Sequence, residues 1–426
     1  MIRRLRGCIF SSSVQYEFPR QYCIYFIFPC KECGFYKLRY YFSLTYTSAC
    51  VLIYRMDTTV HNEILEVIPH FAIYGDFVSC KPMGNGHINS TYCSVFNQAG
   101  TQVRYTHQRI NKNVFKNPPQ VMDNIKSVTE FLRKYFKNAG LDDVSRRTLT
   151  VVPCWDGKLY YQDAAGEYWR TYLLVENVKT YEVLENEDLA RQLGQIIGAF
   201  QNQLATYDGP RLADTIPRFH DMGMRYEQLE EALSKDVKNR AAGIKDELDF
   251  LFANKERGMI LVEGLKSKKL KEGITHNDTK INNILFDEKT SSPLCVIDLD
   301  TVMPGTVLFD TGDLIRTATN TAEEDEKDTS KVQFNFPLFK ALIEGYYSEA
   351  KGFLSDYEKS LLAESGRNIT QIMAVRMITD YLNGDVYYHI DYPEHNIVRA
   401  RTQITLIKSM DEQWDKVKAF IDGLGK

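Results

Sequence analysis

Polar and apolar residues alternate from residue 71 to about residue 175, a pattern typical of β-strands. The segments FAIYGDFVSCKPM and STYCSVF flank residues 84–86, and NQAG separates STYCSVF from TQVRYTHQRI. Gly and Asn at such turns provide the positive φ angles that hairpins require. TLTVVPC and KLYYQD predict another hairpin across residues 155–157, and a strand ending in YLLVEN follows. We therefore expect a five-stranded antiparallel sheet.

A helix is expected within this region, from Val121 to Tyr135, because apolar residues recur there at three- and four-residue steps. After residue 185 the helical period dominates, beginning with DLARQLGQIIGAFQNQL. Further helices are expected at residues 224–235, 243–254, 335–348, 356–383 and 396–423. Two short strands, NILF and LCVIDLD, interrupt them. The pattern predicts an α+β protein whose N-terminal sheet precedes a mainly helical C-terminal part.

The length and composition support two lobes. A chain of 426 residues exceeds the usual size of one domain, and its 44% hydrophobic and 25% charged residues are ordinary for a globular protein. We assign residues 56–177 to an N-terminal lobe and residues 178–426 to a helical C-terminal lobe. The hinge is expected near Glu176.

Residues 1–55 differ from the rest of the chain. They contain 14 of the aromatic residues, five of the nine cysteines, and eight Lys or Arg against two Glu. Their apolar stretches are too short for a signal peptide or a membrane span, so we expect no membrane partner. Cys30 and Cys33 form a lone CxxC, which is weak evidence for zinc. We interpret this segment as an extension with no fold of its own, so that the working protein begins at Met56.

The remaining composition indicates an intracellular protein. The other four cysteines are scattered in apolar contexts and are expected to be buried free thiols in a reducing cytoplasm: Cys80, Cys93, Cys154 and Cys295. Residues 56–426 carry an acidic excess, which argues against nucleic acid as a partner. The oligomeric state is left open.

The segment GITHNDTKINNILFD, residues 273–287, carries the strongest chemical signal. It reads H-x-D-x-x-x-x-N at His276, Asp278 and Asn283, and Asp298 follows in the apolar segment CVIDLD. A carboxylate in an apolar strand needs a partner, and Mg²⁺ would accept oxygen ligands from Asn283 and Asp298. Asp278 would then take a proton from an acceptor hydroxyl. The alternative is a polar loop in which His276 belongs to the core and Asp298 caps a strand.

HNDTKINNIL together with VIDLD resembles the aminoglycoside phosphotransferase family, which has a two-lobed, protein-kinase-like fold. The strings LFDTGDLIR and NTAEEDEKD are similar, more narrowly, to bacterial N-acetylhexosamine 1-kinases. The resemblance covers most of residues 70–425. It implies that Asp278 is the catalytic base and that Asn283 and Asp298 hold Mg²⁺. HRD, DFG and APE motifs are absent at the corresponding places, so a small-molecule kinase is favoured over a protein kinase.

The nucleotide is expected at the first hairpin. The stretch GNGHINST could donate hydrogen bonds to phosphates through Gly84, Gly86 and Asn89, although a plain hairpin turn would look alike. In RYTHQRI, Arg104 and Arg109 are candidates for the cation that contacts the phosphates.

The resemblance points to Arg109 for this cation. Its partner would be a carboxylate of the following helix, and the sequence leaves Asp123 and Glu130 as equal candidates. Glu176 would border the adenine, although a strand-end carboxylate without a role is an equal reading.

The acceptor side is expected after Asp298. Asp310 and Asp313 are predicted to support the catalytic loop by accepting hydrogen bonds from its backbone or from His276, unless Asp313 caps the helix LIRTATN. Arg376 lies on an apolar helical face, with Asp380 as an expected partner at i+4. The resemblance suggests that Arg376 and Tyr387 instead reach the ring hydroxyls of a sugar.

We therefore expect a cytoplasmic enzyme that transfers the γ-phosphoryl group of ATP to a sugar, at the anomeric hydroxyl of N-acetylglucosamine or N-acetylgalactosamine. One alternative is a kinase of an amino alcohol or aminoglycoside, for which the acidic run at residues 323–328 could provide an acidic pocket. Another is a non-catalytic nucleotide-binding protein, which would bind ATP without turnover.

Overall fold

The computed structural model describes residues 22–30, 34–42, 58–83 and 89–425. The chain divides into two units, residues 1–62 and 63–426. In the first unit, β1 (Tyr22–Cys30) pairs antiparallel with β2 (Gly34–Phe42). These two strands lie in the segment for which we expected no fold. Helix α1 (Thr58–Val67) crosses the boundary between the units.

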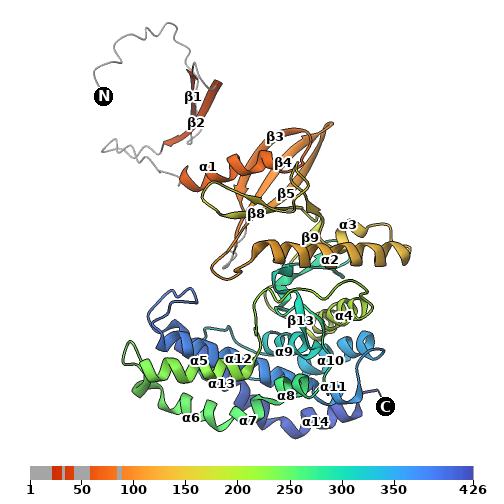
Figure 1. The fold of residues 1–426 in the computed structure, drawn as a ribbon, viewed down its shortest axis with the longest axis vertical. Helices are drawn as coiled ribbons and strands as arrows, with labels where there is room; N and C mark the ends of the chain where they lie inside the picture. Colours follow the sequence, from red (N-terminus) through yellow and green to blue (C-terminus); the bar gives the residue numbers. More distant parts are fainter. Residues whose placement is uncertain (1–21, 31–33, 43–57, 84–88, 426) are drawn as a thin grey trace. The chain divides into compact units, whose positions relative to one another are not determined.

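The N-terminal part of the second unit is an antiparallel sheet (Figure 1). Within the described residues it has six strands rather than the five expected, in the order β3-β4-β5-β8-β6, with β7 also paired to β8. The strands are β3 (Asp76–Pro82), β4 (Ser90–Gln98), β5 (Thr101–Ile110), β6 (Val151–Val152), β7 (Tyr161–Gln162) and β8 (Tyr168–Leu173).

The predicted hairpin across residues 155–157 is wrong in its pairing. The chain does turn there, and the Lys158 carbonyl accepts a hydrogen bond from Cys154 N at 2.7 Å. However, β6 pairs with Tyr172 and Thr171 of β8, whereas β7 pairs with Trp169 and Tyr168 of the same strand. The two segments therefore share β8 as a partner instead of pairing with each other.

Helix α2 (Pro118–Asn138) connects the sheet to the core of the helical part. Asn117 caps its first turn by accepting a hydrogen bond from Gln120 N, and Pro118 occupies its first position, where no backbone N–H is needed. The predicted apolar face is the buried one. It packs in one cluster with Ile110 and Tyr172 of the sheet and with residues of the C-terminal helices.

The C-terminal part is mainly helical. Its longer helices are α4 (Glu187–Leu204), α5 (Met222–Lys235), α6 (Lys245–Ala253), α9 (Val307–Ala318), α10 (Phe336–Ala350), α12 (Leu362–Leu382), α13 (His395–Glu412) and α14 (Trp414–Gly423). The shorter ones are α3 (Val144–Arg147), α7 (Lys255–Gly258), α8 (Ile260–Lys266) and α11 (Asp356–Ser360). The 3₁₀ turns are η1 (Ile68–His70), η2 (Ala241–Ile244), η3 (Ile281–Asn283), η4 (Leu299–Thr301) and η5 (Thr329–Lys331). No helix among the described residues is long and apolar enough to cross a membrane.

Five short strands frame the segment that the sequence singled out. Strands β12 (Pro293–Val296), β11 (Ile284–Asp287) and β9 (Val178–Lys179) form one small sheet, and β10 (Gly273–Thr275) pairs with β13 (Met303–Gly305). The loop between β10 and β11 contains His276, Asp278 and Asn283. Asp298 follows β12, so both candidate segments leave neighbouring strands.

Helix α9 contacts this loop and also packs tightly against α12. A Cβ atom on Gly312 of α9 would lie only 2.5 Å from the Ser365 carbonyl oxygen of α12, so the glycine permits this close approach. Helix α12 is itself buried along most of its length. The packing of α9 against α12 fixes the position of the α9 side chains that bond the loop.

Candidate active site

Two aspartates of α9 hold the backbone of residues 276–283, the predicted catalytic loop. The two carboxylate oxygens of Asp310 accept hydrogen bonds from His276 N at 3.0 Å and from Asn277 N at 2.6 Å. Asp313 accepts a third from Thr279 N at 3.0 Å. The loop therefore rests on α9 through charge-assisted hydrogen bonds. Asp313 lies inside α9, which is capped by Thr306, so the alternative reading of Asp313 as a helix cap is wrong.

His276 links the catalytic loop to the segment that carries Asp298. Its Nδ1 accepts a hydrogen bond from Asp278 N at 3.2 Å, and its Nε2 lies 2.8 Å from the carbonyl oxygen of Ile297. Because Nδ1 accepts, Nε2 carries the proton and donates a hydrogen bond to the carbonyl oxygen of Ile297. The ring is therefore a neutral connection between the residue before Asp298 and the loop.

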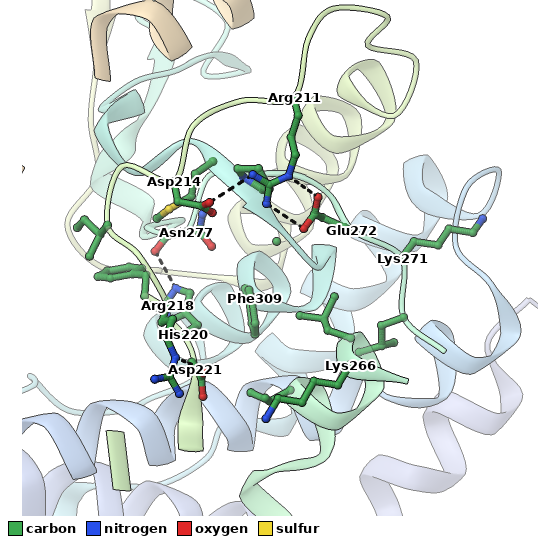
Figure 2. Close-up of a pocket in the computed structure, with 18 of the residues that line it drawn as sticks. Arg211, Asp214, Arg218, His220, Asp221, Lys266, Lys271, Glu272, Asn277 and Phe309 are labelled. Atoms are coloured by element: carbon green, nitrogen blue, oxygen red, sulfur yellow. Dashed lines mark hydrogen bonds and ion pairs between the residues drawn. The ribbon is translucent and has the colours of Figure 1, made fainter. Parts of the chain in front are cut away.

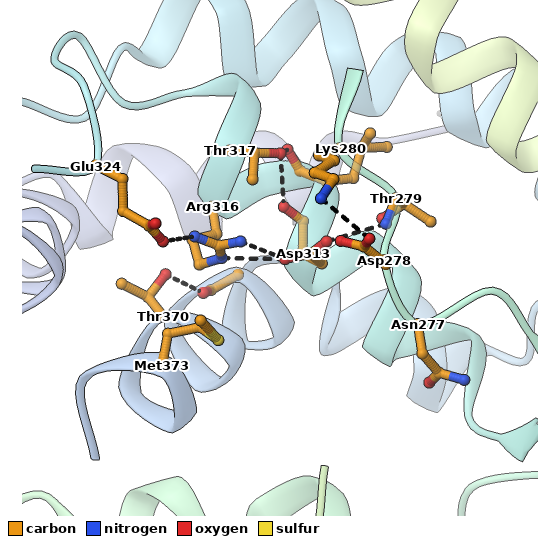
Figure 3. A network of polar contacts seen from close by, with 12 residues as sticks. Asn277, Asp278, Thr279, Lys280, Asp313, Arg316, Thr317, Glu324, Thr370 and Met373 are labelled. Atoms are coloured by element: carbon orange, nitrogen blue, oxygen red, sulfur yellow. Dashed lines mark hydrogen bonds and ion pairs between the residues drawn. The ribbon is translucent and has the colours of Figure 1, made fainter. Parts of the chain in front are cut away.

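The side chain of Asp278 has two donors nearby, Asn283 and Lys280, and Figure 3 shows the contact with Lys280. Asn283 Nδ2 donates to its carbonyl oxygen at 2.8 Å and to its Oδ2 at 3.1 Å, and Lys280 Nζ lies 3.2 Å from the same Oδ2. Burial by itself would raise the pKa of Asp278, but the ammonium group of Lys280 outweighs it and the pKa is lowered. Asp278 is therefore ionised at neutral pH and can accept a proton. Lys280 was not among the predicted site residues.

Asp298 lies just after β12, not within a strand as expected, and adopts a left-handed conformation with φ of 58°. Burial, and then the carboxylates of Asp300 and Asp278, raise its pKa to about 6. This crowding of negative charge indicates that the site is suited to a cation.

The donor set at Asn283 and Asp298 fits Mg²⁺. Asn283 uses its amide nitrogen for Asp278, which leaves its amide oxygen for another partner. Among the described residues, no side chain or backbone group donates a hydrogen bond to the Asp298 carboxylate. No group of three or more His, Cys, Asp or Glu in that part of the chain could hold a metal. Mg²⁺ commonly takes only one or two protein ligands, with phosphates and water completing its shell.

A buried ion pair that the sequence analysis missed joins this segment to the sheet. Arg170 of β8 contacts Asp300, and Asn89 Nδ2 donates to the same carboxylate at 2.7 Å. Arg170 also donates to Gln108 Oε1 at 2.8 Å. Asn89 was predicted to bind phosphate, but its amide is engaged by Asp300 and by the backbone N–H of Asn111. The sequence feature that could have indicated this ion pair is Arg170 itself, a charged residue inside the strand YWRTYL.

The other predicted nucleotide-binding residues are partly described. Arg109 contacts Glu63 of α1 at 3.3 Å and Ser90 Oγ at 3.3 Å. The carboxylate beside Arg109 is thus Glu63, and the expectation of Asp123 or Glu130 was wrong.

Glu176 accepts a hydrogen bond from Arg104 Nε at 2.8 Å. Arg104, the other cation considered for the phosphates, is therefore paired at the end of the sheet. Gly84 and Gly86 lie outside the described residues.

Arg376 and Tyr387, the residues predicted to contact the acceptor, lie together, with 3.4 Å between Arg376 Nη2 and the Tyr387 hydroxyl. The guanidinium of Arg376 also lies over the ring of Phe219, 5.0 Å from its centroid. Asp380 does not pair with Arg376 as expected, because it accepts hydrogen bonds from three backbone N–H groups of residues 386–388, at 2.8 to 3.0 Å. The loop after α12 folds back over the helix end and occupies this carboxylate.

A cavity of about 390 Å³ is lined by Arg376, Tyr387, Tyr388 and Arg225. Burial, and then the charge of Arg376, lowers the pKa of Arg225 to about 10. Arg225, which was not among the predicted site residues, donates to the Phe219 carbonyl oxygen at 2.6 Å. Two guanidinium groups therefore border this cavity.

The acidic run at residues 323–328 does not supply an open negative pocket. Glu324 is neutralised by Arg316 at 3.2 Å (Figure 3). It is also neutralised by Arg399, whose Nε lies 3.1 Å away. Arg316 also donates to Asp313 at 2.8 Å. Burial by itself would lower the pKa of Arg316, but the carboxylates of Asp313 and Glu324 raise it. Glu323, Asp325 and Asp328 are exposed.

The sequence model of the phosphotransferase enzyme family matches residues 114–335, just over half of the chain. The chain belongs to this family. The match includes the whole catalytic loop with Asp278 and Asn283, as well as Asp298, Asp310 and Asp313. Membership confirms the family predicted from the sequence and identifies the protein as a phosphotransferase enzyme.

Several solved structures are similar to this chain. A structure of a microcompartment-associated aminopropanol kinase is similar with a TM-score of 0.50 and 16% identity, and the match covers 85% of this chain and 99% of that one. A spectinomycin phosphotransferase in complex with ADP and spectinomycin gives 0.49 and 14%, covering 85% and 99%. An aminoglycoside phosphotransferase from Alicyclobacillus acidocaldarius gives 0.48 and 12%, covering 83% and 96%. The first likeness confirms the predicted α+β, protein-kinase-like fold.

Proposed function

We propose that this phosphotransferase moves the γ-phosphoryl group of ATP to a hydroxyl of a small sugar. The anomeric hydroxyl of N-acetylglucosamine or N-acetylgalactosamine fits best, and the product is then the sugar 1-phosphate. The observation that carries the proposal is the charge of the acceptor side, where Arg376 faces the cavity with no carboxylate partner among the described residues. ATP use places the reaction in the cytoplasm.

The charge distribution disfavours a cationic acceptor. An amino alcohol or aminoglycoside would place an ammonium group beside Arg376 and Arg225, whose like charges already disfavour one another. Two carboxylates line the cavity, but Asp380 accepts hydrogen bonds from backbone N–H groups and Glu231 pairs with Lys235 at 2.6 Å. Glu324 of the acidic run is paired with two arginines. A neutral sugar avoids this repulsion. Its hydroxyl and amide oxygens can accept hydrogen bonds from guanidinium groups, and the rings of Tyr387 and Tyr388 offer flat surfaces for the sugar.

In the proposed reaction the acceptor oxygen attacks the γ-phosphorus. The new O–P bond forms as the bond to the β–γ bridging oxygen breaks and ADP leaves. Asp278 accepts the proton of the attacking hydroxyl, which its lowered pKa permits at neutral pH. Lys280, held beside Asp278, contributes positive charge at the side where the phosphoryl group passes.

Asn283 and Asp298 are proposed to hold Mg²⁺ through their side-chain oxygens. When bound, the ion supplies positive charge that neutralises the phosphate oxygens. The chain's own contribution is to orient these two groups. Asn283 is fixed by its hydrogen bonds to Asp278, and Asp298 follows Ile297, whose carbonyl oxygen accepts from His276.

A test of the proposal measures ADP release by the full-length protein with Mg·ATP and a panel of acceptors. The panel contains N-acetylglucosamine, N-acetylgalactosamine, choline, 1-amino-2-propanol and spectinomycin. We expect the highest kcat/KM with a hexosamine, and Asp278→Ala should lower kcat by about 10²- to 10⁴-fold while the protein still binds Mg·ATP.

Two controls separate the parts of the proposal. Arg401→Ala, on an exposed arginine paired with Glu247, should leave the rate unchanged. Asn283→Ala should require more Mg²⁺ for half-maximal rate. A clear preference for choline, aminopropanol or spectinomycin would refute the sugar acceptor. ATP binding without turnover on any acceptor would instead point to a non-catalytic protein.

A further inference from the structure

A second cavity, of about 760 Å³, lies beside the catalytic loop (Figure 2). It is lined by Asn277 but by neither Asp278, Lys280 nor Arg376. Figure 3 shows Asn277 pointing away from the Asp278–Lys280 pair. The cavity therefore lies on the other side of the loop from the proposed catalytic base. Its volume is within the range of small-molecule sites.

The interior of this cavity is mostly apolar. Six side chains from four different segments contribute to it: Phe219, Val262, Leu265, Leu270, Met303 and Phe309. They belong to the loop before α5, to α8 and the residues after it, to β13 and to α9. Such a surface favours an aromatic or aliphatic group of a ligand, because binding removes apolar area from water.

The charged residues around the cavity leave an excess of positive charge. The acidic residues are paired, since Arg211 binds Glu272 at 2.8 Å and Asp214 at 3.3 Å (Figure 2). Asp221 is likewise paired with Arg218 at 2.7 Å.

Three lysines complete the charged lining: Lys266, Lys268 and Lys271. Within the described residues none of them forms an ion pair, although Lys266 lies close enough to Asp221 to help lower the pKa of that carboxyl. The lining therefore lacks an anion to match these lysines.

The wall next to the catalytic loop contains an unsatisfied polar atom. His220 is 5% exposed, and its Nε2 lies 3.4 Å from the carbonyl oxygen of Asn277. If Nε2 donates this hydrogen bond, Nδ1 is an acceptor, and it has no partner among the described residues. A buried acceptor without a donor is unfavourable.

We infer that this cavity binds an amphipathic organic anion, a small molecule with an aromatic or aliphatic body and one carboxylate or phosphate. The body lies against Phe219, Leu265 and Phe309, and the anionic group is attracted by the combined positive charge of the three lysines. This ligand is separate from ATP and from the acceptor, because their proposed residues lie outside the cavity. The inference does not depend on which acceptor the enzyme uses.

The test is calorimetric titration of the full-length protein with phenyl phosphate or benzoate, in the presence of saturating Mg·ADP. Benzyl alcohol serves as the uncharged comparison. We expect both anions to bind, and benzyl alcohol to bind at least about tenfold more weakly. Lys266→Gln, Lys268→Gln and Lys271→Gln together should weaken anion binding about tenfold, because these exposed substitutions remove the attracting charges.

The matched control carries Lys126→Gln, Lys134→Gln and Lys137→Gln, three exposed lysines of α2 that change the net charge equally. It should bind both anions like the parent, and so should Arg376→Ala. Ile216→Trp, which fills the cavity from its lining loop, should abolish binding. Absence of anion binding up to about 10 mM, equal weakening in both triple variants, or loss of binding in Arg376→Ala would each overturn the inference.

Discussion

Arg170 and Asp300 form an ion pair that is almost completely buried, with 1% and 3% of their side chains exposed. Arg170 belongs to β8 of the sheet, and Asp300 lies two residues after Asp298. The pair therefore connects the sheet to the segment that carries the proposed metal ligand. Burial by itself would lower the pKa of Arg170, but the carboxylate of Asp300 raises it, so Arg170 stays charged.

Removal of one member of this pair should be strongly destabilising. Arg170→Met leaves Asp300 as a buried charge without its cation, and we expect the free energy of unfolding to fall by about 3–5 kcal/mol. The double variant Arg170→Met/Asp300→Leu removes both charges and should recover much of this loss. Urea unfolding of the parent, both single variants and the double variant measures the coupling. Losses that simply add in the double variant would show that the pair is not coupled.

Asp310 should act on the rate through the position of the catalytic loop. In Asp310→Asn one carboxylate oxygen becomes an amide NH₂ group, which donates and does not accept hydrogen bonds. The side chain can then no longer accept from both His276 N and Asn277 N through separate oxygens. We expect kcat to fall about tenfold or more, with little change in the KM for ATP, and the free energy of unfolding to fall by about 1–3 kcal/mol.

Steady-state kinetics and urea unfolding of the same preparation separate the two effects of Asp310→Asn. Ser127→Ala, which removes an exposed hydroxyl bonded to its own helix at 2.8 Å, is a control for general effects of substitution. A variant as stable as the parent and with the parent kcat would contradict the role of Asp310.

The features that the sequence predicted are those encoded locally. Asp278 and Asn283 lie five residues apart on one loop, and the apolar period of α2 is contained in one helix. The Arg170–Asp300 pair joins residues 130 positions apart, so no local pattern reveals it. The expected Arg376–Asp380 pair failed for a related reason. Spacing along a helix permits the contact, but the backbone of residues 386–388 folds back and takes the carboxylate.

The buried His107 should make stability depend on pH. It is completely buried between Ser94 Oγ at 2.7 Å and Thr171 Oγ1 at 2.8 Å, and burial lowers its pKa from 6.5 to about 4. Between pH 4 and 6.5 the unfolded chain binds a proton at this residue that the folded protein does not bind. The titration of His107 therefore leaves the free energy of unfolding unchanged above pH 6.5. As the pH falls from 6.5 to 4, it lowers this free energy by about 3 kcal/mol.

His107→Gln keeps polar groups near both hydroxyls and removes this titration. Free energies of unfolding measured at intervals from pH 4 to pH 7 should therefore fall less steeply for the variant than for the parent. The carboxylates titrate in both proteins, so the difference between the two curves isolates His107. Parallel curves over this range would contradict the assignment.

Arg376 should contribute to acceptor binding rather than to ATP binding. Arg376→Ala removes donors that face the 390 Å³ cavity, and hydrogen bonds from a charged group contribute enough to raise the acceptor KM about tenfold to a hundredfold. The KM for ATP should stay the same, because the proposed phosphate-binding residues lie on the sheet and the catalytic loop. Arg376→Lys keeps the charge without the planar guanidinium and should fall between the parent and Arg376→Ala.

Initial rates of ADP release over a range of N-acetylglucosamine and ATP concentrations measure both KM values for these Arg376 variants. Tyr387→Phe removes only the hydroxyl that lies 3.4 Å from Arg376, so it should raise the acceptor KM by a smaller factor. Arg401→Ala again serves as the control for loss of an arginine. An equal rise in both KM values would indicate that Arg376 supports the general structure of the site. An unchanged acceptor KM would place the acceptor elsewhere.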